Sequence, residues 1–92
     1  MRHRADLNQN GIVVALRAAG CSVHVLSQQG DGCPDVLVGV HGQNLLLEIK
    51  APTGKRTPLQ LVWHAAWRGR VQVVTSVTEA LALIDRERRA RA

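Results

Sequence analysis

The dipeptide His41-Gly42 separates two runs of Val and Leu, and it constrains the fold of this chain more than any other feature. Glycine tolerates positive φ, and histidine accepts it more readily than most residues, so the pair suits a tight two-residue turn between antiparallel strands. Such a turn fixes the register of the two strands. Counted outward from Val40 and Gln43, this register places Asp35 opposite Glu48.

Successive side chains of a strand point to opposite faces, so the predicted hairpin has two different faces. One is an unbroken apolar layer of Val36, Val38, Val40, Leu45, Leu47 and Ile49. The other carries Asp35, Leu37, Gly39, Asn44, Leu46, Glu48 and Lys50. Opposed carboxylates repel each other at Cβ separations of about 4.5–5.5 Å. A divalent cation would offset this repulsion.

The acidic pair and the nearby lysine predict a particular chemistry. Mg²⁺ prefers oxygen ligands from one or two carboxylates together with waters. Lys50, two residues beyond Glu48 on the same face, could neutralise developing negative charge or hold an attacking water. Asp35, Glu48 and Lys50 therefore predict a site that cleaves phosphodiesters with Mg²⁺ or Mn²⁺. The alternative interpretation is that Asp35 only begins a strand and that Glu48 and Lys50 lie on a solvated strand face.

Helix starts are marked by capping residues that are followed three positions later by Glu or Gln. The pairs are Asp6 with Gln9, Thr57 with Gln60, and Ser76 with Glu79. We expect helices over about 6–19 and 58–69, and a third that follows Ser76 and frays over 86–91. Runs of Val, Leu and Ile predict strands over 22–27, 35–40, 44–51 and 71–75.

The order α-β-β-β-α-β-α predicts an α/β fold with a mixed four-stranded sheet flanked by helices. Short links favour an antiparallel meander for the first three strands, and a helical crossover can bring the fourth parallel to a neighbour. With 92 residues, the chain has room for one domain over 1–92, with a basic end from about 86. Its small core, which has two Trp but no Phe or Tyr, would gain from an interface, so we expect a homodimer.

The charge balance favours a polyanionic partner. Twelve Lys and Arg against seven Asp and Glu give a net charge of +5, which places nucleic acid first among possible partners. A solvated basic surface is the alternative. No apolar stretch approaches the roughly 20 residues that span a bilayer, so we expect a cytoplasmic protein, bacterial or phage-encoded, with no membrane partner. Cys21 and Cys33 are expected to be buried or idle thiols.

Further motifs carry a family resemblance over most of the chain, from Asn8 to about Ile84. Pro34-Asp35 is followed by Glu48-Ile49-Lys50 and then by Gln60-x-x-Trp63. This pattern resembles the PD-(D/E)XK nuclease superfamily, and specifically the VRR-NUC (virus-type replication-repair nuclease) domains, which implies a restriction-endonuclease-like core.

The resemblance also implies roles for individual residues. Asp35, Glu48 and the backbone carbonyl of Ile49 would bind the metal, Lys50 would assist the nucleophilic water, and Gln60 would reach the site from its helix. The competing interpretation of Gln60 is the capping box, and one side chain cannot easily do both at once. Trp63 and Trp67 are expected in the core or an interface rather than as base-stacking platforms, and His64 as a surface or packing residue.

One departure affects the expected activity. Family members usually carry a Glu in the first helix, and the position that we align with it is Gly11. The leading hypothesis is a metal-dependent endonuclease acting on branched or structured DNA, similar to Holliday-junction resolvases, with backbone contacts from Lys55, Arg56, Arg68 and Arg70. The alternative is a nucleic-acid-binding module whose catalysis is lost or suppressed through Gly11. A structural interaction domain is a third possibility.

Overall fold

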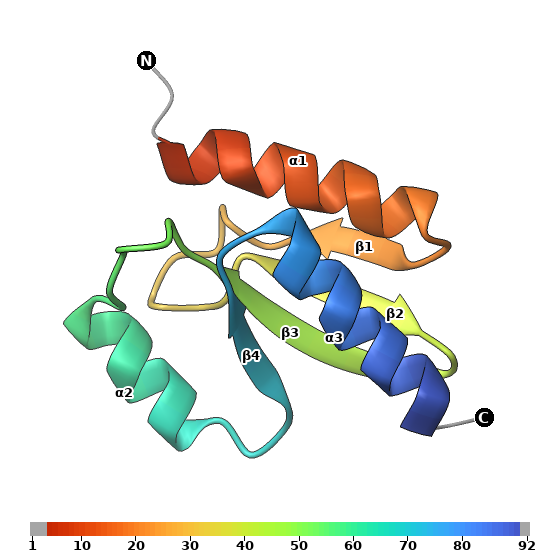
Figure 1. The fold of residues 1–92 in the computed structure, drawn as a ribbon. Coiled ribbons are helices and arrows are strands. Elements are labelled where there is room, and N and C mark those ends of the chain that lie inside the picture. The colour runs from red at the N-terminus through yellow and green to blue at the C-terminus, as the bar shows by residue number, and fades with distance from the viewer. Residues whose placement is uncertain (1–3, 91–92) are drawn as a thin grey trace.

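The computed structural model describes residues 4–90, and side chains from Asn8 to Ala90. Its elements are, in chain order, α1 (Arg4–Ala18), β1 (Ser22–Val25), β2 (Val36–Val40), β3 (Gln43–Ile49), α2 (Pro58–Ala66), β4 (Val71–Val74) and α3 (Val77–Ala90) (Figure 1). The strands form one sheet in the order β1-β2-β3-β4. The first three are antiparallel, and β4 pairs parallel with β3. The predicted α/β class, element order and mixed sheet are confirmed.

The hairpin between β2 and β3 has the register that the turn predicts. Its ladder runs from Val40 opposite Gln43 to Val36 opposite Leu47. His41 and Gly42 both have positive φ, 51° and 76°, as a type I′ turn requires. The twist of this turn matches that of the flanking strands, so two residues are enough to reverse the chain.

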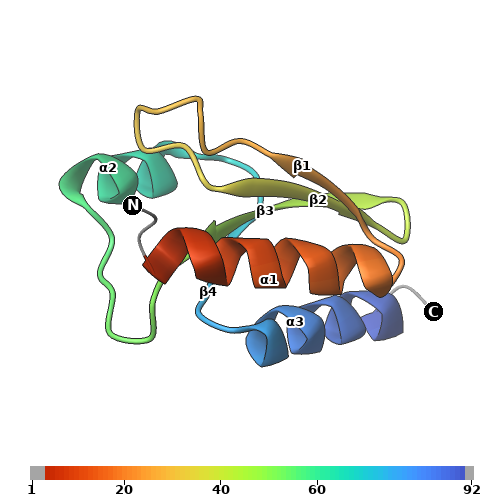
Figure 2. The same cartoon turned by 90° about the horizontal axis from the view of Figure 1, so that it is seen from above.

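The helices lie on both sides of the sheet. α1 and α3 lie side by side on one face, whereas α2 lies on the opposite side (Figures 1 and 2). All six residues of the apolar hairpin face are buried under α1 and α3. The helices contribute Ile12, Val13, Leu16, Ala80, Leu83 and Ile84 to this core. The opposite face of the hairpin, which carries the acidic residues, is therefore the face toward α2.

The helix boundaries differ from the predicted ones at two ends. α1 begins at Arg4, so Asp6 lies inside the helix and the predicted cap at Asp6 is wrong; Arg4 and Ala5 are good helix formers that extend it. α3 continues to Ala90, so the predicted fraying is also wrong for the described residues. Arg88 donates to the carbonyl of Ala19, which ties the last turns of α3 to the end of α1.

A second contact holds the end of α3. Arg70, just before β4, donates two hydrogen bonds to the Glu87 carboxylate, with N–O distances of 2.5 and 2.6 Å. Bidentate pairs of this kind are the strongest charge-assisted contacts of arginine. Cys21 and Cys33 are free thiols, as expected. Within residues 4–90, no helix is both long enough and apolar enough to cross a membrane.

Candidate active site

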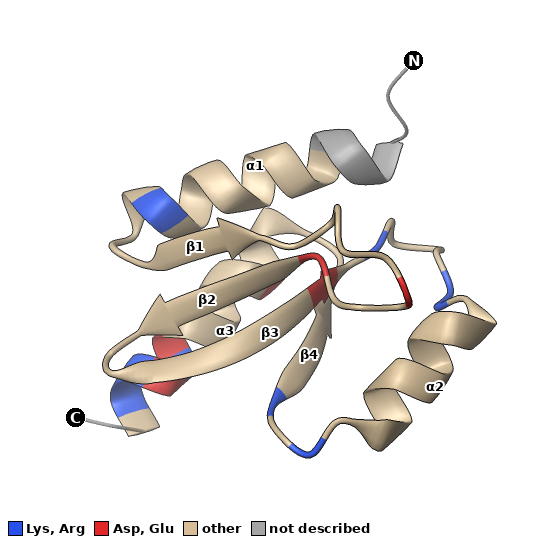
Figure 3. Cartoon of the chain, turned by 180° about the vertical axis from the view of Figure 1, so that it is seen from behind, with Lys and Arg blue, Asp and Glu red and all other residues tan. Residues whose placement is uncertain are grey.

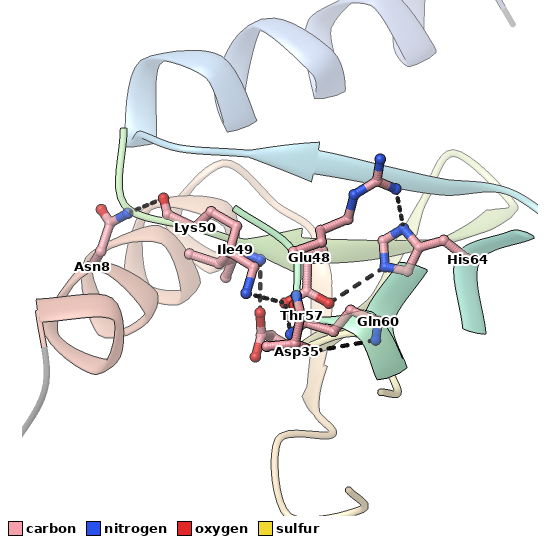
Figure 4. Close-up of polar contacts among 9 residues, drawn as sticks. Asn8, Asp35, Glu48, Ile49, Lys50, Thr57, Gln60 and His64 are labelled. Atoms are coloured by element: carbon pink, nitrogen blue, oxygen red, sulfur yellow. Dashed lines mark hydrogen bonds and ion pairs between the residues drawn. The ribbon is translucent and has the colours of Figure 1, made fainter. Parts of the chain in front are cut away.

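The carboxyl group of Asp35 ends the β2–β3 ladder. Asp35 donates its backbone N–H to Leu47 at 3.0 Å, and its Oδ2 accepts the N–H of Ile49 at 2.7 Å. The regular ladder therefore stops at Val36 and Leu47, one pair before the predicted opposition of Asp35 and Glu48. The side chain of Asp35 adds a second link to β3, through Oδ2 to the N–H of Ile49, beside Glu48 (Figure 4).

Glu48 is a buried acid with a perturbed pKa. Its side chain is only 1% exposed. Burial raises its pKa to about 8. A hydrogen bond with Asp35, in which Glu48 is the donor, and the charge of Asp35 act in the same direction, while Lys50 and Arg56 lower the pKa. A buried carboxyl group whose pKa is shifted by burial and by a specific charged partner is a candidate for a functional site.

Lys50 accompanies Glu48 at the end of β3. Its Nζ lies 4.0 Å from Oε2 of Glu48, and its side chain is largely buried. The backbone at this point is tied to the neighbouring elements, because Lys50 donates its N–H to Val74 and Asn8 of α1 donates to the carbonyls of Lys50 and Thr75. α1 and β4 thus both fix the strand end that carries the charged residues.

Gln60 has both of the roles that were treated as competing. Its Oε1 accepts the backbone N–H of Thr57 at 2.8 Å, and Thr57 Oγ1 accepts the backbone N–H of Gln60, which completes the capping box of α2. Its Nε2 donates to Glu48 Oε2 at 3.1 Å. The expectation that one side chain could not easily do both is wrong, because the two ends of the amide point in different directions.

His64 lies at the site, which sequence reasoning did not predict. It was expected at the surface or in packing, but its Nε2 lies 3.4 Å from Glu48 Oε1 and its side chain is 6% exposed. Its Nδ1 contacts Arg56 at 3.1 Å. Burial, and then the charges of Arg56 and Lys50, lower the pKa of His64. The available signal was spacing, since residues four apart share one face of a helix and His64 follows Gln60 by four.

The loop before Asp35 holds the start of α2 against the sheet. Gly32 has a φ of +82°, and a Cβ at this position would lie 2.5 Å from the carbonyl oxygen of Leu59. Only glycine permits this approach. The close contact sets α2 where Gln60 and His64 can reach Glu48.

The four predicted phosphate contacts have different environments. Lys55 and Arg56 precede α2 and Arg68 follows it, in segments that Figure 3 shows as basic on both sides of this helix. Arg56 also contacts His64 within the site. Arg70 is engaged by Glu87, away from α2.

The two tryptophans form a separate apolar feature beside the site. Trp63 and Trp67 stack with ring centroids 4.6 Å apart. Together with Leu37 and Leu46 of the sheet they line a pocket of about 360 Å³. Trp67 is exposed rather than part of the core, and no apolar residue of α2 is buried. α2 thus presents apolar residues outward as well as polar residues toward Glu48.

The structure places Gly11 away from the carboxylates. A Cβ at Gly11 would meet only Val77 of α3, at 3.9 Å. Gln9 instead lies on the same side of α1 as the buried Ile12 and Val13, and its Nε2 donates to Ser27 Oγ at 3.5 Å. Ser27 directly follows Leu26, whose N–H binds the carbonyl of Asp35. Gln9, unlike Gly11, thus contacts the segment that leads to Asp35, and its neighbour Asn8 contacts the end of β3 at Lys50.

The donor set fits a hard divalent cation. Among the described residues, no three His, Cys, Asp or Glu side chains are grouped as metal ligands. Two carboxylates completed by backbone carbonyl and water are a set that Mg²⁺ accepts. The raised pKa of Glu48 reflects negative charge that is buried beside Asp35 without full compensation, and a cation would compensate it.

Comparison with known proteins gives one informative match. No family model and no curated protein matches the chain. A solved structure described as "VRR_NUC domain" superimposes on it with a TM-score of 0.74 and 30% sequence identity. The match covers 91% of this chain and 97% of that structure.

The pKa of Glu48 predicts an unusual dependence of stability on pH. In EDTA, we expect the free energy of unfolding to fall as pH rises from about 5 to about 8 and then to level off. Between its ordinary pKa of 4.5 and the folded value of about 8, Glu48 binds a proton in the folded chain only. One such proton contributes a slope of up to about 1.4 kcal/mol per pH unit.

Urea unfolding followed by tryptophan fluorescence measures this slope in the wild type and in Glu48→Gln, where it should be shallower. Glu79→Gln is the control, because hydrogen bonds from Thr75 lower the pKa of that exposed carboxyl and its titration lies below this window. Equal slopes in the wild type and Glu48→Gln would contradict the prediction.

Proposed function

Because the chain belongs to the VRR-NUC domain family, we propose that it is a metal-dependent endonuclease that hydrolyses phosphodiesters in branched or otherwise structured DNA. The observation that carries the proposal is the buried Glu48 carboxyl beside Asp35, surrounded by donors from Lys50, Gln60 and His64. The preference for branched DNA rests on analogy with Holliday-junction resolvases.

Each residue of the site has a role in this proposal. Asp35, Glu48 and the carbonyl of Ile49 would hold Mg²⁺ or Mn²⁺, which would stabilise charge on the phosphate and acidify a bound water. Lys50 holds the attacking water or offsets charge that develops on the phosphate. Gln60 orients Glu48 and at the same time caps α2.

The basic segments around α2 are the proposed DNA contacts. Lys55 and Arg56 precede the helix and Arg68 follows it, so both segments adjoin the helix that completes the site. Arg70 would contribute less to DNA binding, because two of its N–H groups already donate to Glu87. Contacts to phosphate carry no sequence information, so the enzyme would have little base specificity.

We further propose a homodimer formed through α2. The helix exposes Leu59, Leu61 and Val62, and the exposed Trp67 follows it. A contiguous exposed apolar patch can mark a protein–protein interface. A second copy would cover these residues. Two sites in one dimer would suit the two strands that a resolvase must cut.

One observation favours the alternative, a DNA-binding module with weak catalysis. On the described part of α1, the side chains nearest the site are those of Asn8 and Gln9, which carry amide groups. No acidic side chain lies there among the described residues. An amide oxygen is a neutral ligand and holds a divalent cation less strongly than a carboxylate.

The direct test is cleavage of labelled single-stranded, duplex, flap and four-way-junction DNA with Mg²⁺, Mn²⁺ or EDTA. We expect metal-dependent cutting that falls at least about 100-fold in Asp35→Ala, because the acid that holds the cation is lost. Binding of uncut DNA in EDTA should persist in this variant, since its basic segments are intact. Binding without cutting in the wild type would support the alternative, and neither binding nor cutting would overturn both.

Two substitutions in α1 test which position faces the metal. Gln9→Glu should raise Mn²⁺ affinity and cleavage by about tenfold, because it adds a carboxylate at the site end of the helix. Gly11→Glu adds the same charge two residues further along α1, beside α3, and should leave both nearly unchanged. Isothermal titration calorimetry with Mn²⁺ measures the affinities. A gain in Gly11→Glu without one in Gln9→Glu would restore the original alignment.

The dimer is tested by sedimentation of matched variants. Val62→Glu should shift the chain toward monomer, because a buried unpaired charge is costly at an interface. Val14→Glu is the control: Val14 is 67% exposed on α1 and Val62 is 69% exposed on α2, so both changes place the same charge at similar exposure. A wild type that is monomeric at high concentration, or equal behaviour of the two variants, would reject this interface.

A further inference from the structure

Three side chains form a continuous chain of contacts from the basic segment before α2 to the buried acid. Arg56 Nη1 lies 3.1 Å from His64 Nδ1. The other ring nitrogen, His64 Nε2, lies 3.4 Å from Glu48 Oε1. The hydrogen-bonding roles can be deduced from the first contact, because arginine has a fixed role as a donor.

The guanidinium group determines the tautomer of the histidine. Arginine carries only donors and keeps its proton in proteins, so His64 Nδ1 must accept from Arg56. A neutral imidazole has one N–H, which must then be on Nε2. Nε2 therefore donates toward Glu48, and Arg56 specifies the direction of that hydrogen bond without touching Glu48 itself.

His64 completes the set of donors on the carboxyl group of Glu48. Gln60 donates to Oε2 of Glu48, and His64 lies against Oε1. Two successive turns of α2 therefore each contact one oxygen of this carboxyl group. Each carboxylate oxygen has two acceptor positions, so a donor on each oxygen leaves room for a cation. The two contacts fix the plane of the carboxyl group, which a single contact would leave free to rotate.

We propose that His64 is a positioning residue that orients Glu48 for metal binding, and that Arg56 holds His64 in the Nε2–H tautomer that this requires. The inference rests on the proposed function, because it takes Glu48 as a metal ligand. Arg56 has further N–H groups beyond the one at His64, so a phosphate contact and the tautomer lock can coexist on one side chain. The link thus joins the proposed DNA surface to the proposed metal ligand.

The experiment separates hydrogen bonding from packing by two substitutions at one position. His64→Phe keeps a ring but removes both nitrogens, whereas His64→Gln keeps an N–H donor that can reach Glu48. Calorimetric Mn²⁺ affinity without DNA should fall about 10- to 100-fold in His64→Phe and stay within about threefold in His64→Gln. His24→Phe, at an exposed histidine on β1, is the matched control and should leave the affinity unchanged.

A spectrum of the wild type tests the tautomer directly. Two-bond ¹H–¹⁵N correlations of the histidine rings should show the Nε2–H form for His64, and Arg56→Gln should turn this into a mixture. Arg68→Gln, at a basic residue that does not contact His64, is the control and should preserve the Nε2–H form. An Nδ1–H form in the wild type would overturn the inference even if His64→Phe does not fold.

The outcomes distinguish this inference from the proposal on which it rests. A wild type that binds no Mn²⁺ would overturn the proposed function and the inference together. Mn²⁺ binding that His64→Phe leaves unchanged would overturn the inference alone and leave the metal site in place. Loss of affinity in His64→Gln equal to that in His64→Phe would also overturn it, because the donor would then be irrelevant.

Discussion

The buried carboxyl group of Glu48 is the constraint to which the rest of this structure responds. A charged group is costly to bury alone, so the chain surrounds it with donors and a lysine. Its four neighbours come from three parts of the fold: Asp35 directly precedes β2, Lys50 directly follows β3, and Gln60 and His64 lie on α2. The hairpin, the crossover and the close approach of Gly32 to Leu59 together bring these segments to one point.

The part of the site that lies on the hairpin follows from local rules. A two-residue turn at His41-Gly42 leaves one register, and alternation then separates an apolar face from an acidic one. Asp35, Glu48 and Lys50 could therefore be brought together by counting along the chain. The prediction failed only at the last pair. Asp35 donates its backbone N–H to Leu47 and accepts the N–H of Ile49 with its side chain, instead of pairing with Glu48.

The contributions of the helices depend on how whole elements pack, and sequence periodicity does not give this orientation. Gly11 was placed at the site by alignment, but the rotation of α1 turns position 11 toward α3 and position 9 toward Ser27. His64 was overlooked because an exposed apolar helix gives no clear signal of which face meets the sheet. The double role of Gln60 needed the direction of each end of its amide, which only coordinates provide.

The way in which α2 is attached has a consequence for motion. No apolar residue of this helix is buried, and the helix is linked to the sheet by polar contacts at Glu48 and by the backbone approach at Gly32. The apolar core under α1 and α3 does not include it. Segments with few buried apolar contacts open locally at free energies below that of global unfolding. We therefore expect α2 to open locally, which would separate Gln60 and His64 from Glu48 while the sheet stays folded.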